Sequence, residues 1–109
     1  MKIYVASPYS HINKAIQEDR YADAMKYTAE LFKLGYYAIS PIVYGHEMAR
    51  IYELPTDAAW WEGFNFWLMD SCDVVHVYMM PGWEESKGIK EEIEYAKSQG
   101  IPIIYVPEK

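Results

Sequence analysis

The sequence has one cysteine among its 109 residues, so no disulfide can form within the chain. Basic residues are also few, because ten Lys and Arg stand against sixteen Asp and Glu and give a net charge of −6. Binding to duplex nucleic acid depends on clustered cations, so this balance excludes such a partner and leaves small ligands open. No charged-then-apolar leader opens the chain, and no apolar run approaches the roughly 18 residues that cross a bilayer. These absences predict a cytoplasmic protein without membrane contact.

Short apolar runs alternate with helical patterns along the whole chain. Runs rich in β-branched and aromatic residues predict four strands, at 2–7, 36–40, 73–80 and 101–106. Helical spacing predicts a helix from about Asn13 to the stop at Gly35, two more that are separated by a break at 54–57, and a fourth that starts near Gly88. The alternation predicts one α/β domain over residues 1–109, a small doubly wound, flavodoxin- or Rossmann-like parallel sheet of about four strands with helices on both faces.

Polar residues follow the first two predicted strands, at the edge of a parallel sheet where ligands bind. The turn after the first strand supplies Ser7, Pro8, Ser10 and His11, and His46 follows the second strand. The two histidines lie about 35 residues apart, a spacing that matches no metal signature, so we predict no metal site. The turn also lacks the glycines and threonines of a flavin phosphate loop, which disfavours a flavodoxin-like electron carrier.

Two adjacent glutamates stand out in the last predicted helix, whose apolar stripe is Ile89, Ile93 and Ala96. Glu91 falls on the side of this helix that faces solvent. Glu92 flanks the stripe near the helix N-terminus and the sheet edge, where the helix dipole favours an ionised carboxylate. Such a group can attack a carbon that bears a leaving group, as in glycoside cleavage. The alternative is a salt-bridge residue at the rim of the fold.

Four segments together, KIYVASPYS, LGYYAISP, DSCDVVHVY and SKGIKEEIEYAKSQGIPIIYV, resemble the nucleoside 2-deoxyribosyltransferase superfamily and its 2′-deoxynucleoside 5′-monophosphate N-glycosidase branch. The resemblance covers nearly the whole chain. It implies that the Ser-x-Gly-x-x-x-Glu pattern, here Ser86, Gly88 and Glu92, ends in the nucleophile, with no cofactor needed. A serine at position 86 resembles the branch that acts on 5′-monophosphates, although a plain helix cap explains it as well. Members of the superfamily commonly form dimers or larger homo-oligomers.

Further residues have two interpretations each, and for Tyr4 the resemblance supplies one of them. Tyr4 would point its hydroxyl toward the nucleophile, or simply pack in the core. Arg20 lies on the inward stripe of its helix, where it meets either a substrate phosphate or a carboxylate. His11 and His46 would contact base or phosphate, and Trp60 or Trp61 would stack on the base or lie at an interface between copies.

The chain departs from the superfamily at the position of the acid that protonates the leaving base. That position, eight residues before Asp73, holds Asn65, whose amide donates a hydrogen bond but cannot deliver a proton. Asp70, a little over one helical turn further on, could supply the acid or merely cap its helix. The departure leaves two functions open, an N-glycosidase or deoxyribosyltransferase and a catalytically silent nucleotide-binding module.

Overall fold

The structure, a computed structural model, describes residues 1–108. Its elements follow one another as β1 (Lys2–Ala6), α1 (Lys14–Lys33), β2 (Tyr37–Ile39), α2 (Pro41–Tyr52), α3 (Ala58–Asp70), β3 (Val74–Met79), the short 3₁₀ helix η1 (Trp83–Glu85), α4 (Lys87–Gln99) and β4 (Ile103–Pro107). The strands form one parallel sheet in the order β2-β1-β3-β4. The predicted doubly wound α/β fold is therefore confirmed.

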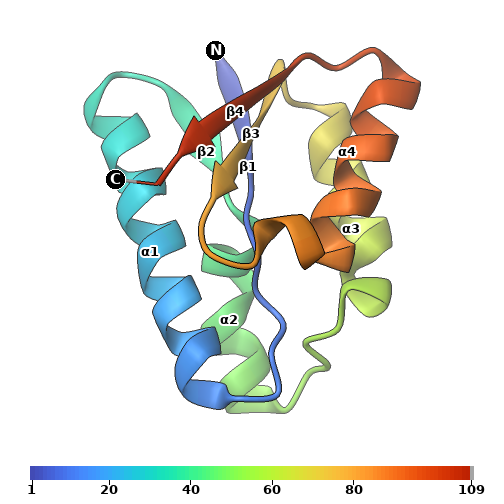
Figure 1. Ribbon diagram of the computed structural model, residues 1–109. Helices are drawn as coiled ribbons and strands as arrows, with labels where there is room; N and C mark the ends of the chain where they lie inside the picture. Colours follow the sequence, from blue (N-terminus) through green and yellow to red (C-terminus); the bar gives the residue numbers. More distant parts are fainter. Residues whose placement is uncertain (109) are drawn as a thin grey trace.

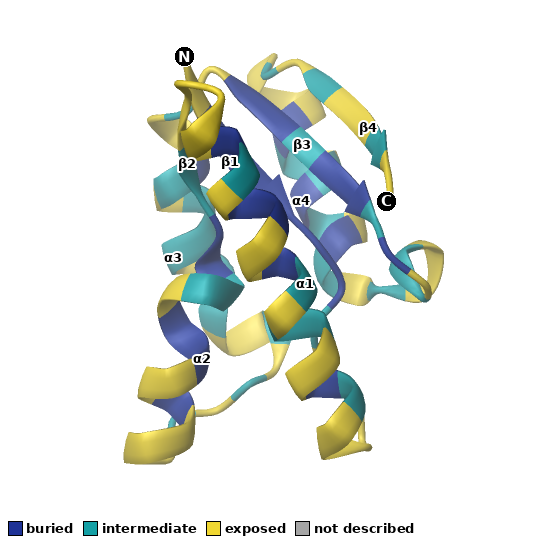
Figure 2. Cartoon of the chain, turned by 90° about the vertical axis from the view of Figure 1, so that its left-hand side faces the viewer, coloured by how far each residue is buried: buried dark blue, intermediate teal, exposed yellow. Residues whose placement is uncertain are grey.

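The sheet separates two hydrophobic layers (Figure 1). Ile3 and Val5 of β1 pack in the cluster with α1, whereas Tyr4 and Ala6 pack in the cluster with α3 and α4. Neighbouring residues of a strand point to opposite faces of a sheet, which explains the alternation. Figure 2 shows the buried central strands β1 and β3 beside the more exposed β4. The side chain of Tyr4 consequently lies on the α4 side of the sheet.

Helix boundaries follow from local capping chemistry. The Asn13 side chain caps α1 by accepting a hydrogen bond from the Ala15 backbone N–H at 2.9 Å. Ser40, expected at the end of a strand, instead caps α2, because Pro41 fits the first turn of a helix. Asp57 caps α3, as the break at 54–57 predicts. The turns after β1 and β2 are thus fixed by the helices that follow them.

Helix α3 is apolar all round but only partly buried. Met69 is fully buried, while Trp60 and Trp67 are 52% and 68% exposed. Tyr44, on α2, stacks on Phe64 at 5.6 Å between ring centroids. Burial within the fold therefore accounts for only part of this helix, and its use at an interface stays a prediction.

Candidate functional site

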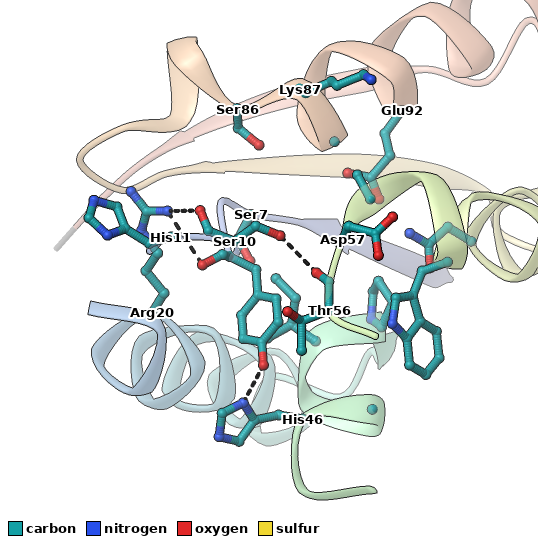
Figure 3. A pocket seen from close by; sticks show the side chains of 18 of the residues that line it. Ser7, Ser10, His11, Arg20, His46, Thr56, Asp57, Ser86, Lys87 and Glu92 are labelled. Carbon is teal, nitrogen blue, oxygen red and sulfur yellow. Dashed lines mark hydrogen bonds between the residues drawn. The ribbon is translucent and has the colours of Figure 1, made fainter. Parts of the chain in front are cut away.

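A cavity of about 610 Å³ opens at the carboxyl ends of β1, β2 and β3. Its walls come from the loop after β1, the start of α2, the start of α3, and the segment from Gly82 to the first turns of α4 (Figure 3). The chain passes from β1 to α1 on one face of the sheet and from β3 to α4 on the other. The cavity therefore lies at the switch point, where open α/β sheets bind their ligands.

Glu92 lies on the second turn of α4 and contributes to the cavity wall. The Ser86 hydroxyl fixes the start of this helix by accepting a hydrogen bond from the Ile89 backbone N–H at 3.2 Å. Ile89 and Ala96 are buried, and Glu92 lies between them on the same face, with 7% of its surface exposed. Glu92 is thus part of the buried stripe, not a residue beside it.

Tyr4 holds the carboxylate of Glu92. Its hydroxyl, fully buried on β1, donates a hydrogen bond to Glu92 Oε2. Burial, and then the charge of Glu92, raises the pKa of Tyr4 well above its ordinary value, so the phenol keeps its proton. Tyr4 is not itself part of the cavity lining and reaches the site through this contact.

The ionised state expected for Glu92 from the helix N-terminus is wrong for the free protein. Burial raises the pKa of Glu92 to about 8, with Glu91 adding to the rise and the Tyr4 hydrogen bond opposing it. Desolvation acts on the whole charge, whereas the dipole effect fades beyond the first helical turn. At neutral pH most molecules hold Glu92 protonated. A perturbed acid on a cavity wall is a common mark of a functional site.

Two buried oxygen atoms on the cavity wall have no hydrogen-bond partner among the described residues. They are Ser7 Oγ, just after β1, and Asn65 Oδ1, on α3. A buried polar atom that stays unpaired destabilises the fold, so such atoms are uncommon unless a ligand or another group binds them. Both atoms are therefore placed to bind a ligand.

The end of the cavity away from Glu92 is cationic (Figure 3). The Arg20 guanidinium contacts the backbone carbonyl oxygens of Ser10 at 3.0 Å and Pro81 at 3.5 Å, and no carboxylate within residues 1–108 forms an ion pair with it. Gly82 allows this position, because it has φ of 91° and a Cβ there would meet Arg20 Nη2 at 2.5 Å. Two partners were predicted for Arg20, a substrate phosphate or a carboxylate, and the carboxylate is absent among residues 1–108.

Several other predicted residues also line the cavity. Ser86 and Gly88 lie at the N-terminus of α4, whose backbone N–H groups favour anions. The Ser10 hydroxyl donates to the Thr56 carbonyl at 2.8 Å, which joins the loop after β1 to the loop before α3. His11 also lines the cavity, and its Nδ1 accepts a hydrogen bond from a backbone N–H.

His46 lines the cavity on α2 and is hydrogen-bonded on both ring nitrogens. Nδ1 lies 2.6 Å from the Tyr9 hydroxyl, and Nε2 lies 2.8 Å from Glu18 Oε1. Close by, Gly45 leaves room for the ring of Trp61, which comes within 3.0 Å of where a Cβ would be. Trp61 thus forms an aromatic part of the wall, whereas Trp60 lies outside the lining.

Two predicted residues are not brought to the cavity. Pro8 is fully buried beneath the loop and takes no part in the lining. Asp70 accepts a hydrogen bond from the Tyr95 hydroxyl on α4 and is exposed, away from the cavity wall. The proposed move of the catalytic acid to Asp70 therefore has no support in the geometry.

The residues predicted for the site do not include Tyr9, Glu18 or Asp57. Tyr9 and Asp57 line the cavity, and their positions next to predicted strand and helix ends were a usable signal. Glu18 lies on the exposed side of α1 with no pattern around it. Its role depends on contact with His46, 28 residues away, which no local motif shows.

The comparisons with known proteins place the chain in a family. A family model described as Domain of unknown function (DUF1937) matches residues 1–108. The chain belongs to that family. No curated protein significantly matches this chain.

Two further features of the described residues concern metals and membranes. Within residues 1–108, no three His, Cys, Asp or Glu side chains are grouped closely enough to hold a metal ion. None of the helices described there combines the length and apolar character that a membrane crossing requires.

Proposed function

We propose that this domain cleaves the bond between base and sugar in a 2′-deoxynucleoside 5′-monophosphate, through a covalent intermediate on Glu92. The observation that carries the proposal is a buried carboxyl, held by Tyr4, on the wall of a cavity that Arg20 and the N-terminus of α4 also line. A substrate that spans these groups has an anion at one end and an electrophilic carbon at the other. The resemblance to the deoxyribosyltransferase superfamily supports the same assignment.

The 5′-phosphate is bound at the cationic end in this mechanism. Arg20 supplies a full positive charge, while Ser86 and the backbone N–H groups of α4 supply directed donors. Binding there brings C1′ of the sugar toward Glu92. Phosphate binding thus serves to position the reacting carbon, which is a large source of rate acceleration.

Glu92 acts as the nucleophile once it has lost its proton. Positive charge develops on the sugar as the base departs, and a buried carboxylate stabilises that charge more strongly than a hydrated one. The Tyr4 hydrogen bond favours the carboxylate and fixes Oε2, which leaves Oε1 for attack on C1′. Water then releases the sugar in hydrolysis, or a second base does so in transfer.

One observation favours a second candidate, a silent nucleotide-binding module on the same fold. Glu92 holds its proton at neutral pH, and the amide of Asn65 cannot donate one to a leaving base. A module of this kind would bind the same ligand at the same cavity without cleaving it. The two candidates differ only in turnover.

The deciding experiment incubates the protein with each of the four common 2′-deoxynucleoside 5′-monophosphates and with the matching nucleosides. Free base is measured by chromatography, and binding by calorimetry. We expect base release from at least one monophosphate, faster than from its nucleoside, and loss of that preference in Arg20→Gln. Tight binding of a monophosphate without any release of base would favour the silent module.

The exposed aromatic face leads to a proposal about assembly. Trp60 and Trp67 of α3 are exposed, and ring contacts through Trp61 and Phe64 connect them to each other and to the exposed Tyr44 of α2. A contiguous apolar surface of this kind is typical of contacts between proteins, and we infer that the chain pairs with its own copies there. Light scattering should show a dimer or larger species at micromolar concentration, and Trp67→Glu should shift it toward the monomer. A monomeric wild type would contradict the inference.

A further inference from the structure

A hydrogen-bonded chain of three side chains runs from the cavity to the protein surface. Tyr9, in the loop after β1, contacts His46 Nδ1 at 2.6 Å, and His46 Nε2 contacts Glu18 Oε1 at 2.8 Å. Tyr9 and His46 line the cavity, while Glu18 on α1 is 54% exposed. We call these three residues the Tyr9–His46–Glu18 relay. They join the ligand site to solvent through a buried imidazole.

The surroundings of His46 suit a group that gains and loses a proton. Tyr21 of α1 stacks on the ring at 4.0 Å, and Glu47 of α2 lies 3.9 Å from Nε2. Glu18 and Glu47 thus lie on the same side of one imidazole, and Glu47 is itself paired with the Arg50 guanidinium at 2.8 Å. Glu18 accepts a hydrogen bond from Nε2 of His46. Nδ1 is therefore the ring nitrogen of His46 that exchanges a proton with Tyr9. Burial, and then Glu18 and Tyr21, raises the pKa of Tyr9, which keeps it a neutral phenol able to donate.

The other acids around the cavity suit proton donation less well. Asp57 accepts a hydrogen bond from the Trp60 backbone N–H at 3.2 Å as the cap of α3, so its carboxyl is already used by the helix. Asn65 offers only an amide, and Asp70 lies outside the cavity. Departure of a base is assisted by a proton donor. The relay reaches the wall at Tyr9 and can supply such a proton.

We propose that Tyr9 protonates the leaving base and that His46 replaces the proton, with Glu18 as the positioning residue; this rests on the proposed function. In the first step Glu92 bonds to C1′ and the C1′–N bond breaks, its electron pair going to the base nitrogen. The Tyr9 hydroxyl proton passes to that nitrogen, and the Nδ1 proton of the imidazolium passes to Tyr9.

The second step restores the relay. Water enters where the base has left and attacks C1′, and the bond between C1′ and Glu92 breaks with its electron pair returning to the carboxylate. The water proton passes to Tyr9 while the Tyr9 proton returns to Nδ1 of His46. All protons balance without a further reactant, and one group serves first as acid and then as base.

A second Tyr–His pair in the same molecule provides a matched control. The Tyr27 hydroxyl lies 2.7 Å from Nδ1 of His76, a distance close to that of the relay pair. Neither residue lines the cavity, and burial lowers the pKa of His76. Tyr27→Phe therefore removes the same atom from the same kind of contact without touching the site.

The test compares two kinds of leaving base. The first substrate is whichever common 2′-deoxynucleoside 5′-monophosphate the wild type cleaves fastest. The second is 7-methyl-2′-deoxyguanosine 5′-monophosphate, whose base already carries a positive charge and departs without gaining a proton. We expect Tyr9→Phe and His46→Gln to lower kcat on the first substrate by about 100-fold or more. Glu18→Gln should lower it by about tenfold.

For release of 7-methylguanine, kcat of the same three variants should stay within about fivefold of wild type, because this base needs no proton from the relay. On the first substrate, the wild-type kcat should fall at high pH as Tyr9, the proton donor, loses its proton. Tyr9→Phe should lack that fall. Circular dichroism and the Tyr27→Phe control, which should match wild type, separate these effects from unfolding.

Four results would overturn the relay. Equal losses on both substrates would make the residues structural or binding groups, and unchanged rates in all three variants, with a loss in Asp57→Asn, would move the acid to Asp57. A wild type that releases only 7-methylguanine would also exclude the relay while keeping the cleavage chemistry. A wild type that releases no base from either substrate would overturn the proposed function, and the relay with it.

Discussion

Glu91 and Glu92 are neighbours in sequence with the same side chain, yet they occupy opposite environments. Glu92 is 7% exposed, hydrogen-bonded to Tyr4 and on the cavity wall. Glu91 lies 4.0 Å from the Lys87 ammonium with a quarter of its side chain exposed. Burial, and then contact with Glu62, raises the pKa of Glu91, but only that of Glu92 rises to about 8.

The difference comes from one step of about 100° around a helix. That step moves a carboxyl from a hydrated face to a face packed on the sheet, where desolvation becomes the largest influence on its proton. The chemistry of the site thus depends on how α4 is set by its Ser86 cap and by buried Ile89. Four changes test how far the two acids differ.

The largest effect is expected from exchanging each acid for its amide. Glu92→Gln keeps the shape of the side chain and removes the nucleophile, so base release should fall by about 10³-fold or more while monophosphate binding stays measurable. Glu91→Gln, the matched control on the same helix, should stay within about twofold of wild type. Both are measured by base release and calorimetry. Retained turnover in Glu92→Gln with loss in Glu91→Gln would reverse the assignment.

The next largest effect concerns stability and pH. Because the pKa of Glu92 is about 8 in the folded protein and about 4.5 when unfolded, the native state binds more protons between these values. The contribution of Glu92 to the free energy of unfolding is largest below pH 4.5. It falls by up to about 5 kcal/mol as pH rises through 8. Glu92→Gln should lack this fall.

Urea unfolding at pH 5 and pH 8.5 measures the difference. The difference in unfolding free energy between Glu92→Gln and wild type should favour the variant more at pH 8.5 than at pH 5. Other titrating groups are common to both proteins, so they cancel in this difference. Glu91→Gln should show a much weaker trend, since water reaches that side chain. A parallel pH dependence in wild type and Glu92→Gln would show that Glu92 titrates near its ordinary value.

A smaller effect is expected from the contact that Glu92 has and Glu91 lacks. Tyr4→Phe removes the hydrogen bond that lowers the pKa of Glu92, so that pKa should rise further and the carboxylate become scarcer. We expect kcat at pH 7 to fall by about 10- to 100-fold, with the rising limb of the pH-rate profile moved to higher pH. A loss of rate with an unmoved limb would limit Tyr4 to packing.

The fold could be predicted from the sequence because its signals are local. Strand runs, the Gly35 stop and the Asp57 cap each act over a few residues, and the helical phase at Ile89 and Ala96 places Glu92 near the core. The charge state of Glu92 could not be predicted, since burial depends on how completely the sheet covers it. The relay joins Tyr9 to His46 across 37 residues, a distance no local pattern encodes. Asp70 was proposed from spacing alone, and its helix turns it toward Tyr95.

The smallest effect is expected from giving Glu92 the acidic neighbour that Glu91 already has. Asn65 lines the cavity on α3, which packs against α4, so Asn65→Asp places a further carboxyl in the site. When protonated, the new acid can assist the leaving base; when ionised, it repels the carboxylate of Glu92 and raises its pKa.

The two influences oppose each other, and pH decides between them. Below about pH 6, Asn65→Asp should speed base release by about three- to tenfold, whereas at pH 8 the rate should be unchanged or lower. Asp70→Asn, a change of the same kind on the same helix but outside the cavity, should leave the rate within about twofold. The measurement is kcat across pH 5 to 9 for all three proteins. A collapse of base release in Asp70→Asn with no gain in Asn65→Asp would show that the acid reaches the substrate from position 70, against the contact with Tyr95. A gain in Asn65→Asp on the unmodified base but not on 7-methylguanine would show that proton delivery limits the rate, and that Glu92 works fastest beside a neighbour that is still neutral.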